Sequence, residues 1–231
     1  RILYSLDEQV SNISDIKHKP VREILKYYKF YNGLEVHYDG DMPARSGVGS
    51  SSAFVVGFLN AIMTLNKMTL SKSELAKKSI FLETKILKEI VGSQDQVACA
   101  HGGFNKIKFL KNGEYKINRL KLTSEKKRHL ENNLFLVYSK IQRTAEIVAK
   151  SFVSNLSNRK KNEITNINQI LIEAKKQLNS NSISNFGYLL NESWKVKRTL
   201  SKKVTNNKID QLYDQAISSG SDGGKLLGAG G

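Results

Sequence analysis

The stretch Ser-Gly-Val-Gly-Ser-Ser-Ser-Ala at residues 46–53 constrains this chain most, because the apolar run 54–65 follows it directly. Its two glycines allow the backbone to turn where a Cβ atom would obstruct it. The three serines after the second glycine stand where a helix is expected to begin, and the first N–H groups of a helix have no partner within the helix. These donors and the positive end of the helix dipole favour an anion such as a polyphosphate.

A Gly/Ser turn before a capped helix is the simpler interpretation of this stretch. Two further features favour phosphate binding. The segment Leu34–Tyr38 is expected to be a strand that leads toward the loop, and Arg45 brings a positive charge into it. A strand, a glycine loop and a buried helix in that order are typical of phosphate-binding sites.

The composition is that of a soluble globular protein, with 39% hydrophobic and 25% charged residues in a chain of 231. No uninterrupted apolar run reaches the roughly 18–20 residues that a membrane span needs, so we expect no membrane partner. The single cysteine, Cys99, excludes an internal disulfide and fits a reducing compartment. We therefore expect a cytoplasmic protein.

The formal net charge is +16, from 37 Lys and Arg against 21 Asp and Glu. Such an excess can attract nucleic acid or phosphorylated substrates. The lysines are dispersed among asparagines and isoleucines in the second half of the chain and are not gathered beside stacking aromatic residues. We therefore expect no nucleic-acid partner, although a non-catalytic basic domain that binds nucleic acid remains an alternative.

Strands and the glycine loop are expected mainly in the first 140 residues, and helices in the rest. The pattern predicts helices over 19–31, 53–65, 72–90, 97–100, 144–178, 185–204 and 209–218. It predicts strands over 34–38, 104–109, 115–122 and 134–138, of which the last is apolar throughout and should be central and buried. This segregation favours the α+β class with two lobes, 1–140 and 141–231, over alternating βαβ units.

Two acidic residues have ordinary structural interpretations. Glu83 lies near the middle of the helix predicted over 72–90, where a glutamate usually sits on a solvated face, here paired with Lys85 or Lys88. Asp95 follows a glycine turn and is placed to cap the helix predicted over 97–100. Neither position by itself indicates catalysis.

Several motifs in sequence order resemble those of the GHMP kinases, a family of small-molecule kinases. Residues 43–53, Pro-Ala-Arg-Ser-Gly-Val-Gly-Ser-Ser-Ser-Ala, resemble the family's second motif, Pro-x-x-x-Gly-Leu-Gly-Ser-Ser-x-Ala. Residues 224–231, Gly-Lys-Leu-Leu-Gly-Ala-Gly-Gly, resemble its third motif. Between them, residues 92–96 and 102–105 are similar to the Gln-Asp-Gln and Gly-Gly-Phe-Asn pattern of the D-glycero-D-manno-heptose 7-phosphate kinases.

The resemblance implies a two-lobed fold, with an N-terminal nucleotide-binding lobe like domain 2 of ribosomal protein S5 and a helix-rich, ferredoxin-like C-terminal lobe. It implies an ATP- and Mg²⁺-dependent kinase. The implied reaction phosphorylates the anomeric hydroxyl of D-glycero-D-manno-heptose 7-phosphate to the 1,7-bisphosphate, on the way to a nucleotide-activated heptose for surface polysaccharide. Another sugar-1-kinase of the fucose or galactose type and an inactive remnant are alternatives, and a homodimer is left open.

The resemblance also assigns roles to single residues. Asp95 matches the residue that accepts the proton of the attacking sugar hydroxyl, and Ser51 and Glu83 match the Mg²⁺ partners. The residues that match the nucleotide-binding positions are Pro43, Arg45, Ser46, Gly47, Val48, Gly49, Ser50, Ser51, Ser52, Gly228, Ala229 and Gly230. The positions that match the sugar site are Gly92, Ser93, Gln94, Asp95, Arg143 and Lys225. Of these, Arg143 and Lys225 have solvent exposure as an equal alternative to anion contact.

The chain departs from the family pattern at both ends. The family's first motif, Gly-Gly-Gly-Thr-Asp, is missing, and the chain ends inside the third motif, without its last glycine and the strand that follows. Ser93 stands where many heptose kinases have a lysine. We therefore expect the fold to be incomplete at both ends.

Overall fold

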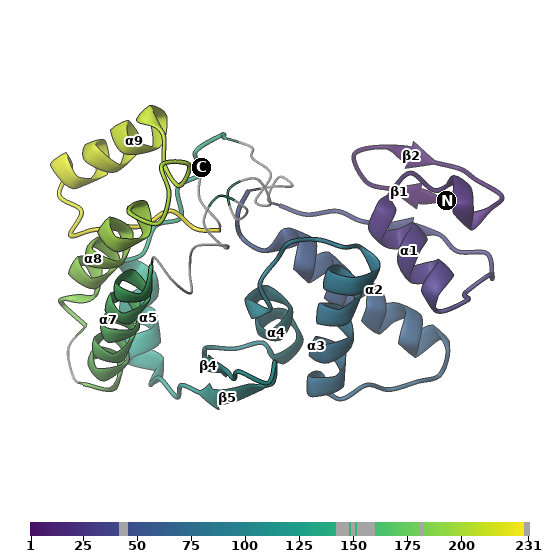
Figure 1. Ribbon diagram of the computed structural model, residues 1–231, viewed down its shortest axis with the longest axis horizontal. Helices are drawn as coiled ribbons and strands as arrows, with labels where there is room; N and C mark the ends of the chain where they lie inside the picture. The colour runs from purple at the N-terminus through teal and green to yellow at the C-terminus, as the bar shows by residue number, and fades with distance from the viewer. Residues whose placement is uncertain (42–45, 142–147, 149–150, 152–159, 181–182, 229–231) are drawn as a thin grey trace. The chain divides into compact units, whose positions relative to one another are not determined.

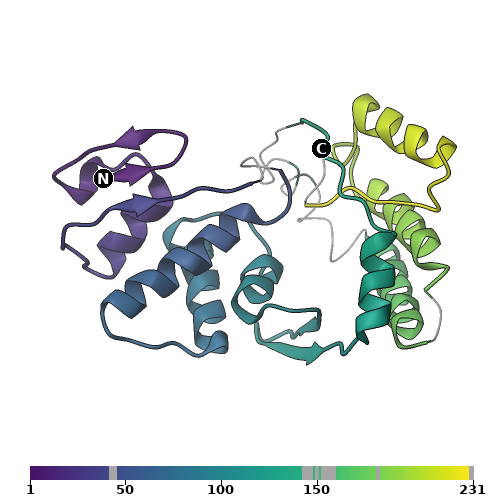
Figure 2. The ribbon, with the colours of Figure 1, turned by 180° about the vertical axis from the view of Figure 1, so that it is seen from behind.

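The computed structural model describes residues 1–41, 46–141, 148, 151, 160–180 and 183–228. The chain divides into two compact units. Unit 1 comprises residues 1–44 and 49–119, and unit 2 comprises residues 45–48 and 120–231. Their elements are shown from two sides (Figures 1 and 2). None of the helices in the described ranges is long and apolar enough to cross a membrane.

Unit 1 is built mainly from helices. They are α1 (Lys19–Tyr27), α2 (Ser50–Leu65), α3 (Lys72–Phe81) and α4 (Gln94–His101), with a 3-10 turn η1 (Ile13–Asp15) and a π-helical turn η2 (Leu82–Ile86). Sequence signals explain several of their starts. Pro20 lies in the first turn of α1, where its missing N–H costs nothing, and Ser71 and Glu74 form the capping box that begins α3.

Two small sheets complete unit 1. Strands β1 (Ile2–Leu3), β2 (Asp7–Glu8) and β3 (Val36–His37) form the first sheet in the order β2-β1-β3, with β2 antiparallel and β3 parallel to β1. Strands β4 (Asn105–Phe109) and β5 (Tyr115–Arg119) form an antiparallel hairpin in which Ile107 faces Ile117. Gly113 has φ +82° in the turn between them, a conformation that favours glycine. The predicted hairpin is therefore confirmed.

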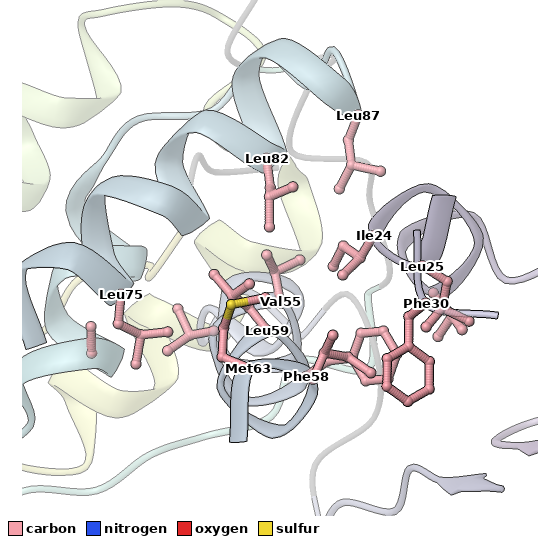
Figure 3. Packing of buried hydrophobic residues seen from close by; sticks show 14 of the residues in the cluster. Ile24, Leu25, Phe30, Val55, Phe58, Leu59, Met63, Leu75, Leu82 and Leu87 are labelled. Atoms are coloured by element: carbon pink, nitrogen blue, oxygen red, sulfur yellow. The ribbon is translucent and has the colours of Figure 1, made fainter. Parts of the chain in front are cut away.

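The core of unit 1 lies around α2. Val55, Leu59 and Ile62 of this helix are fully buried, and α2 contacts α1, α3, η2 and α4. Figure 3 shows their neighbours converging from α1, such as Ile24, and from η2, such as Leu82. Burying one such side chain contributes about 1.5–3 kcal/mol, so this cluster is the main source of the stability of unit 1. The buried helix predicted over 53–65 is confirmed and begins three residues earlier.

Unit 2 is helical in the residues that the structure describes. Its helices are α5 (Ser124–Asn132), α7 (Lys161–Asn179), α8 (Phe186–Arg198) and α9 (Asn207–Ser218). Helices α7 and α8 pack side by side (Figures 1 and 2). A small buried cluster joins Trp194 of α8 to Ile209 of α9, with Val148 and Val204. Most of the first half of the helix predicted over 144–178 lies outside the described residues.

The strand predicted over 134–138 is wrong. These residues form neither helix nor strand, and Phe135, Leu136 and Val137 are 89%, 63% and 71% exposed. An apolar run becomes a central strand only where strands on both sides pair with it, and unit 2 shows no strand within its described ranges. The predicted domain boundary at residue 140 stays a prediction, while the compact units change at residues 119 and 120.

Several predicted elements end earlier than expected. The helix predicted over 19–31 ends at Tyr27, and the one predicted over 185–204 ends at Arg198. The helix predicted over 72–90 is α-helical to Phe81 and continues as the π-helical turn η2. The strand predicted over 34–38 is limited to Val36–His37. Periodicity identified these elements, and their ends depend on local hydrogen bonding that periodicity does not record.

Candidate phosphate and metal site

The first half of the glycine loop, Ser46–Val48, belongs to unit 2 and lies against the end of the described chain. Gly47 has φ +81° and Gly228 has φ +69°. A Cβ atom on Gly228 would lie 3.1 Å from the Cα atom of Gly47, and one on Gly47 would lie 3.4 Å from the carbonyl oxygen of Leu227. The two glycine segments therefore approach each other backbone to backbone, which larger residues would prevent.

Lys197 of α8 holds the second of these glycine segments. Its Nζ atom donates hydrogen bonds to the carbonyl oxygens of Leu226, at 2.8 Å, and Gly228, at 2.6 Å. Burial, with a smaller contribution from the positive charge of Lys225, lowers the pKa of Lys197 to about 8. Lys197 was not among the predicted site residues, because a lysine on a polar helix carries no signal of a contact with a distant loop.

The second half of the loop belongs to unit 1 and begins α2. Gly49 is the N-cap residue, with φ +79°, and Ser50, Ser51 and Ser52 form the first turn. Their hydroxyls have different surroundings, since Ser51 is exposed and Ser52 is buried. The first N–H groups of a helix lack intrahelical partners, so this turn presents donors and a positive dipole end to an anion.

Asp95 lies beside this helix start. A Cβ atom on Gly49 would come within 3.2 Å of the Oδ2 atom of Asp95, so the glycine leaves room for the carboxylate. Asp95 is in the first turn of α4, and the N-cap of that helix is Ser93. The interpretation of Asp95 as a helix cap is therefore wrong. Its half-buried carboxylate lies next to the predicted phosphate-binding turn.

Glu83 is fully buried in η2, and its interpretation as a solvated residue is wrong. Leu82 and Glu83 are consecutive and both are 0% exposed. A π-helical turn is wider than an α-helical one, and such turns are frequent at functional sites. The Oε2 atom of Glu83 accepts a hydrogen bond from Ser52 Oγ, at 3.0 Å, and another from the Nε2 atom of Gln96.

The environment of Glu83 favours its neutral form. Burial raises the pKa of Glu83 to about 7, against the hydrogen bond from Ser52, which lowers it. The negative charges of Glu89 and Asp95 raise it further. Perturbed carboxylates of this kind are concentrated at functional sites.

Unit 1 brings together Gly49, Ser52, Glu83 and Asp95 from among the predicted site residues. Ser51 is exposed, and the hydroxyl bonded to Glu83 is that of Ser52, so the assignment of Ser51 to a metal stays a prediction. Gly92, Gln94 and Lys225 are exposed, Val48 is 40% exposed, and Ser93 is half-buried. Pro43, Arg45, Arg143, Ala229 and Gly230 lie outside the described residues.

Gln96 lies in the motif at residues 92–96, but no role was predicted for it. It is fully buried on α4, on the same face as the buried Val97 and Ala100. A glutamine next to small apolar residues on an inward face needs a polar partner, and this signal was available in the sequence.

The residues around Glu83 fit Mg²⁺. A hard cation of this size takes oxygen ligands from one or two protein groups and keeps several waters. The Oε1 atom of Glu83 is buried without a hydrogen-bond partner among the described residues, and the Ser52 hydroxyl adjoins the same carboxylate. No group of three or more His, Cys, Asp or Glu that could hold a metal ion occurs in the described part of the chain.

Comparison with known proteins places this loop in a family. Residues 17–103 match the family described as GHMP kinases N terminal domain. This chain contains a GHMP kinase N-terminal domain. The matched residues include the glycine–serine turn of α2, Glu83 and Asp95. The predicted resemblance is thus confirmed.

Individual relatives support the same family. The chain is 31% identical over 198 residues to D-glycero-alpha-D-manno-heptose 7-phosphate kinase of Campylobacter jejuni, covering 85% of this chain and 58% of the relative. It is 26% identical to the solved structure of a D-glycero-D-manno-heptose 1-phosphate kinase from Bacteroides thetaiotaomicron, with a TM-score of 0.70, covering 92% of this chain and 60% of the other.

The fold extends to more distant kinases. The mevalonate kinase of Methanococcus jannaschii has a TM-score of 0.67 at 20% identity, over 95% of this chain and 67% of that one. The chain is helix-rich with small sheets, which confirms the predicted mixture of α and β structure. It spans about 60% of the length of the heptose kinases that it matches.

Proposed function

We propose that the protein is an ATP-dependent kinase of D-glycero-D-manno-heptose 7-phosphate that transfers the γ-phosphoryl group to the anomeric hydroxyl. The observation that supports this most is the Asp95 carboxylate, which lies beside the N-terminus of α2, with Gly49 leaving the space between them. A group that receives a proton from the acceptor hydroxyl must lie next to the phosphate being transferred. Asp95 has this position relative to the predicted phosphate-binding turn.

Each part of the site has a role in this reaction. The N–H groups at the start of α2 bind phosphate oxygens, and Glu83 with a serine hydroxyl holds Mg²⁺, which neutralises charge on the phosphates when bound. Asp95 orients the sugar hydroxyl and takes its proton. The hydroxyl oxygen forms a bond to the γ-phosphorus as the bond between that phosphorus and the bridging oxygen of ADP breaks. Phosphoryl transfer depends mainly on such alignment and charge neutralisation.

The substrate proposal draws on the Campylobacter relative, whose name specifies a heptose 7-phosphate. The product would be the 1,7-bisphosphate, a precursor of nucleotide-activated heptose for surface polysaccharide, made in the cytoplasm. A panel of heptose 7-phosphate, heptose, fucose and galactose, each with Mg-ATP, tests this specificity. We expect heptose 7-phosphate to have the highest kcat/KM, and a preference for an unphosphorylated sugar would overturn the substrate assignment.

The role of Asp95 is tested by Asp95→Asn. We expect kcat to fall by about 10²-fold or more, because the amide cannot accept the proton, with little change in ADP affinity. Asp15→Asn is the matched control, since Asp15 is an exposed carboxylate at the end of η1. Turnover of Asp95→Asn within a few-fold of wild type would refute the assignment. Nucleic-acid binding that falls steeply with salt and is unaffected by Mg-ATP would instead support the basic binding domain.

A further inference from the structure

The Glu83 carboxylate is hydrogen-bonded on one side only. Ser52 Oγ, from α2, and Gln96 Nε2, from α4, both donate to Oε2 of Glu83. The other oxygen, Oε1, has no partner among the described residues, although it is buried. Two donors from two different helices are thus concentrated on a single oxygen of a fully buried carboxylate.

A second acceptor in the same cluster is also without a partner. Gln96 is fully buried, and its Oε1 atom has no hydrogen-bond partner within the described part of the chain. A buried acceptor left unpaired costs about 1–3 kcal/mol, so native proteins retain such atoms rarely. Two bare acceptors within one cluster indicate that something positively charged or hydrogen-donating completes it.

We propose that Gln96 and Ser52 are positioning residues that hold Glu83 by Oε2 so that Oε1 is free to bind Mg²⁺. This inference rests on the proposed kinase function and deepens it. Contacts of α2 with both α4 and η2 fix the three side chains relative to one another. A carboxylate held in this way offers one oxygen in a set direction, as a cation with strict octahedral geometry requires.

The test compares buried side chains with and without a contact to Glu83. The variants are Gln96→Met, which keeps the volume and removes the amide, Ser52→Ala, and the control Ser79→Ala. Ser79 lies on α3, is fully buried, and has a hydroxyl with no partner among the residues described. Ser52→Ala and Ser79→Ala therefore each remove one buried hydroxyl, and only the hydroxyl of Ser52 is hydrogen-bonded to Glu83.

Two affinities are measured. The first is the affinity of Mn²⁺ for the protein–ADP complex, obtained from the electron paramagnetic resonance signal of free Mn²⁺. The second is the affinity of the protein for ADP in the absence of metal. We expect Gln96→Met and Ser52→Ala to weaken Mn²⁺ binding about 10–100-fold, the usual effect of losing a group that orients a ligand. ADP affinity without metal should stay within about twofold, and Ser79→Ala should bind Mn²⁺ as wild type does. Ser52→Thr, which keeps the hydroxyl, should restore most of the affinity.

Three results would overturn the inference. The first is that Gln96→Met and Ser52→Ala bind Mn²⁺ as tightly as wild type does. The second is that these variants lose affinity for metal-free ADP by as much as they lose affinity for Mn²⁺. The third is that Ser79→Ala weakens Mn²⁺ binding as much as they do. If far-UV circular dichroism shows that Gln96→Met is unfolded, the Ser52→Ala and Ser52→Thr pair decides. A wild-type chain that binds ADP without any effect of Mg²⁺ or Mn²⁺ would contradict the proposed function itself, a different outcome from wild-type metal binding in the variants.

Discussion

The two units use similar apolar segments in opposite ways. In unit 1, α2 has Val55 and Leu59 fully buried between α1, α3, η2 and α4. In unit 2, the apolar residues 134–137 lie between α5 and the later helices of the sequence, and Phe135 is 89% exposed. The difference shows that hydrophobicity determines what a segment would gain by burial, while the neighbouring elements determine whether it is buried.

The comparison predicts that core truncation has its largest effect in unit 1. We expect Leu59→Ala to lower the free energy of unfolding of unit 1 by about 4 kcal/mol, because the fully buried side chain would leave a cavity between packed helices. Leu189→Ala in unit 2 should lower the free energy of unfolding by about 2 kcal/mol, because Leu189 is 8% exposed and unit 2 has fewer buried hydrophobic residues than unit 1 in its described ranges.

Urea denaturation with two probes measures this difference. Trp194 is the only tryptophan in the sequence and lies in unit 2, so its fluorescence follows that unit, while far-UV circular dichroism follows both. Two units can unfold in separate transitions, and the two probes distinguish them. If both substitutions lowered the free energy of unfolding by the same amount, with either probe, the cores of the two units would not differ in the way that their burial indicates.

The parts of unit 1 that the sequence predicted correctly depend on local patterns. The turn at Gly49, the capping box at Ser71 and the hairpin around Gly113 each result from residues adjacent in the chain. The apolar run 54–65 needed only its own periodicity and length to indicate a buried helix. Family resemblance added Glu83 and Asp95, which the structure brings to the same region as the start of α2.

The parts that the sequence did not predict depend on contacts between distant residues. Gln96 reaches Glu83, and Lys197 reaches Gly228, through packing that no local pattern records. Glu83 is buried within the π-helical turn η2, and the sequence pattern predicted neither the turn nor the burial. The predicted burial of Phe135 was wrong because it also depends on distant residues, namely strands elsewhere in the fold.

Carboxylates in the two units should respond to pH with opposite signs. Burial raises the pKa of Glu83 in unit 1 from 4.5 to about 7. The folded state then binds the extra proton between these values, so the free energy of unfolding falls as pH rises from 4.5 to 7, by up to about 3 kcal/mol. Glu83→Gln should remove this slope and make the chain more stable than wild type at pH 8.

Glu163 in unit 2 provides the opposite case. A hydrogen bond from Lys160 Nζ, at 2.9 Å, lowers the pKa of Glu163, so its contribution is present above pH 4.5 and is lost as pH falls through the lowered pKa. Glu163→Gln should therefore be slightly less stable than wild type at pH 7, with the difference vanishing in acid. Urea denaturation of wild type and both variants from about pH 2 to about pH 8 measures the slopes, and slopes of the same sign would contradict the assigned environments.

The smallest predicted effect concerns helix ends that are alike in the two units. Two residues after the end of α2, Lys67 has φ +57°, and the N–H groups of Lys67 and Met68 donate to the carbonyl oxygens of Thr64 and Met63. Helix α9 is followed by the same pattern, with Gly220 at φ +95° and the N–H groups of Gly220 and Ser221 donating to the carbonyl oxygens of Ile217 and Ala216. Both are Schellman motifs, in which glycine is the favoured residue at the left-handed position.

Exchanging lysine and glycine at residues 67 and 220 tests the contribution of the left-handed residue to stability, without changing the core. We expect Lys67→Gly to raise the free energy of unfolding by about 0.5 kcal/mol, because the relief of the left-handed strain exceeds the entropy that glycine adds to the unfolded chain. Gly220→Lys should lower it by about 1 kcal/mol through conformation alone, since a Cβ atom at residue 220 would meet no atom within 4 Å. Urea denaturation followed by circular dichroism for Lys67→Gly and by Trp194 fluorescence for Gly220→Lys measures both. A destabilising Lys67→Gly or a neutral Gly220→Lys would show that the helix ends differ by more than this residue.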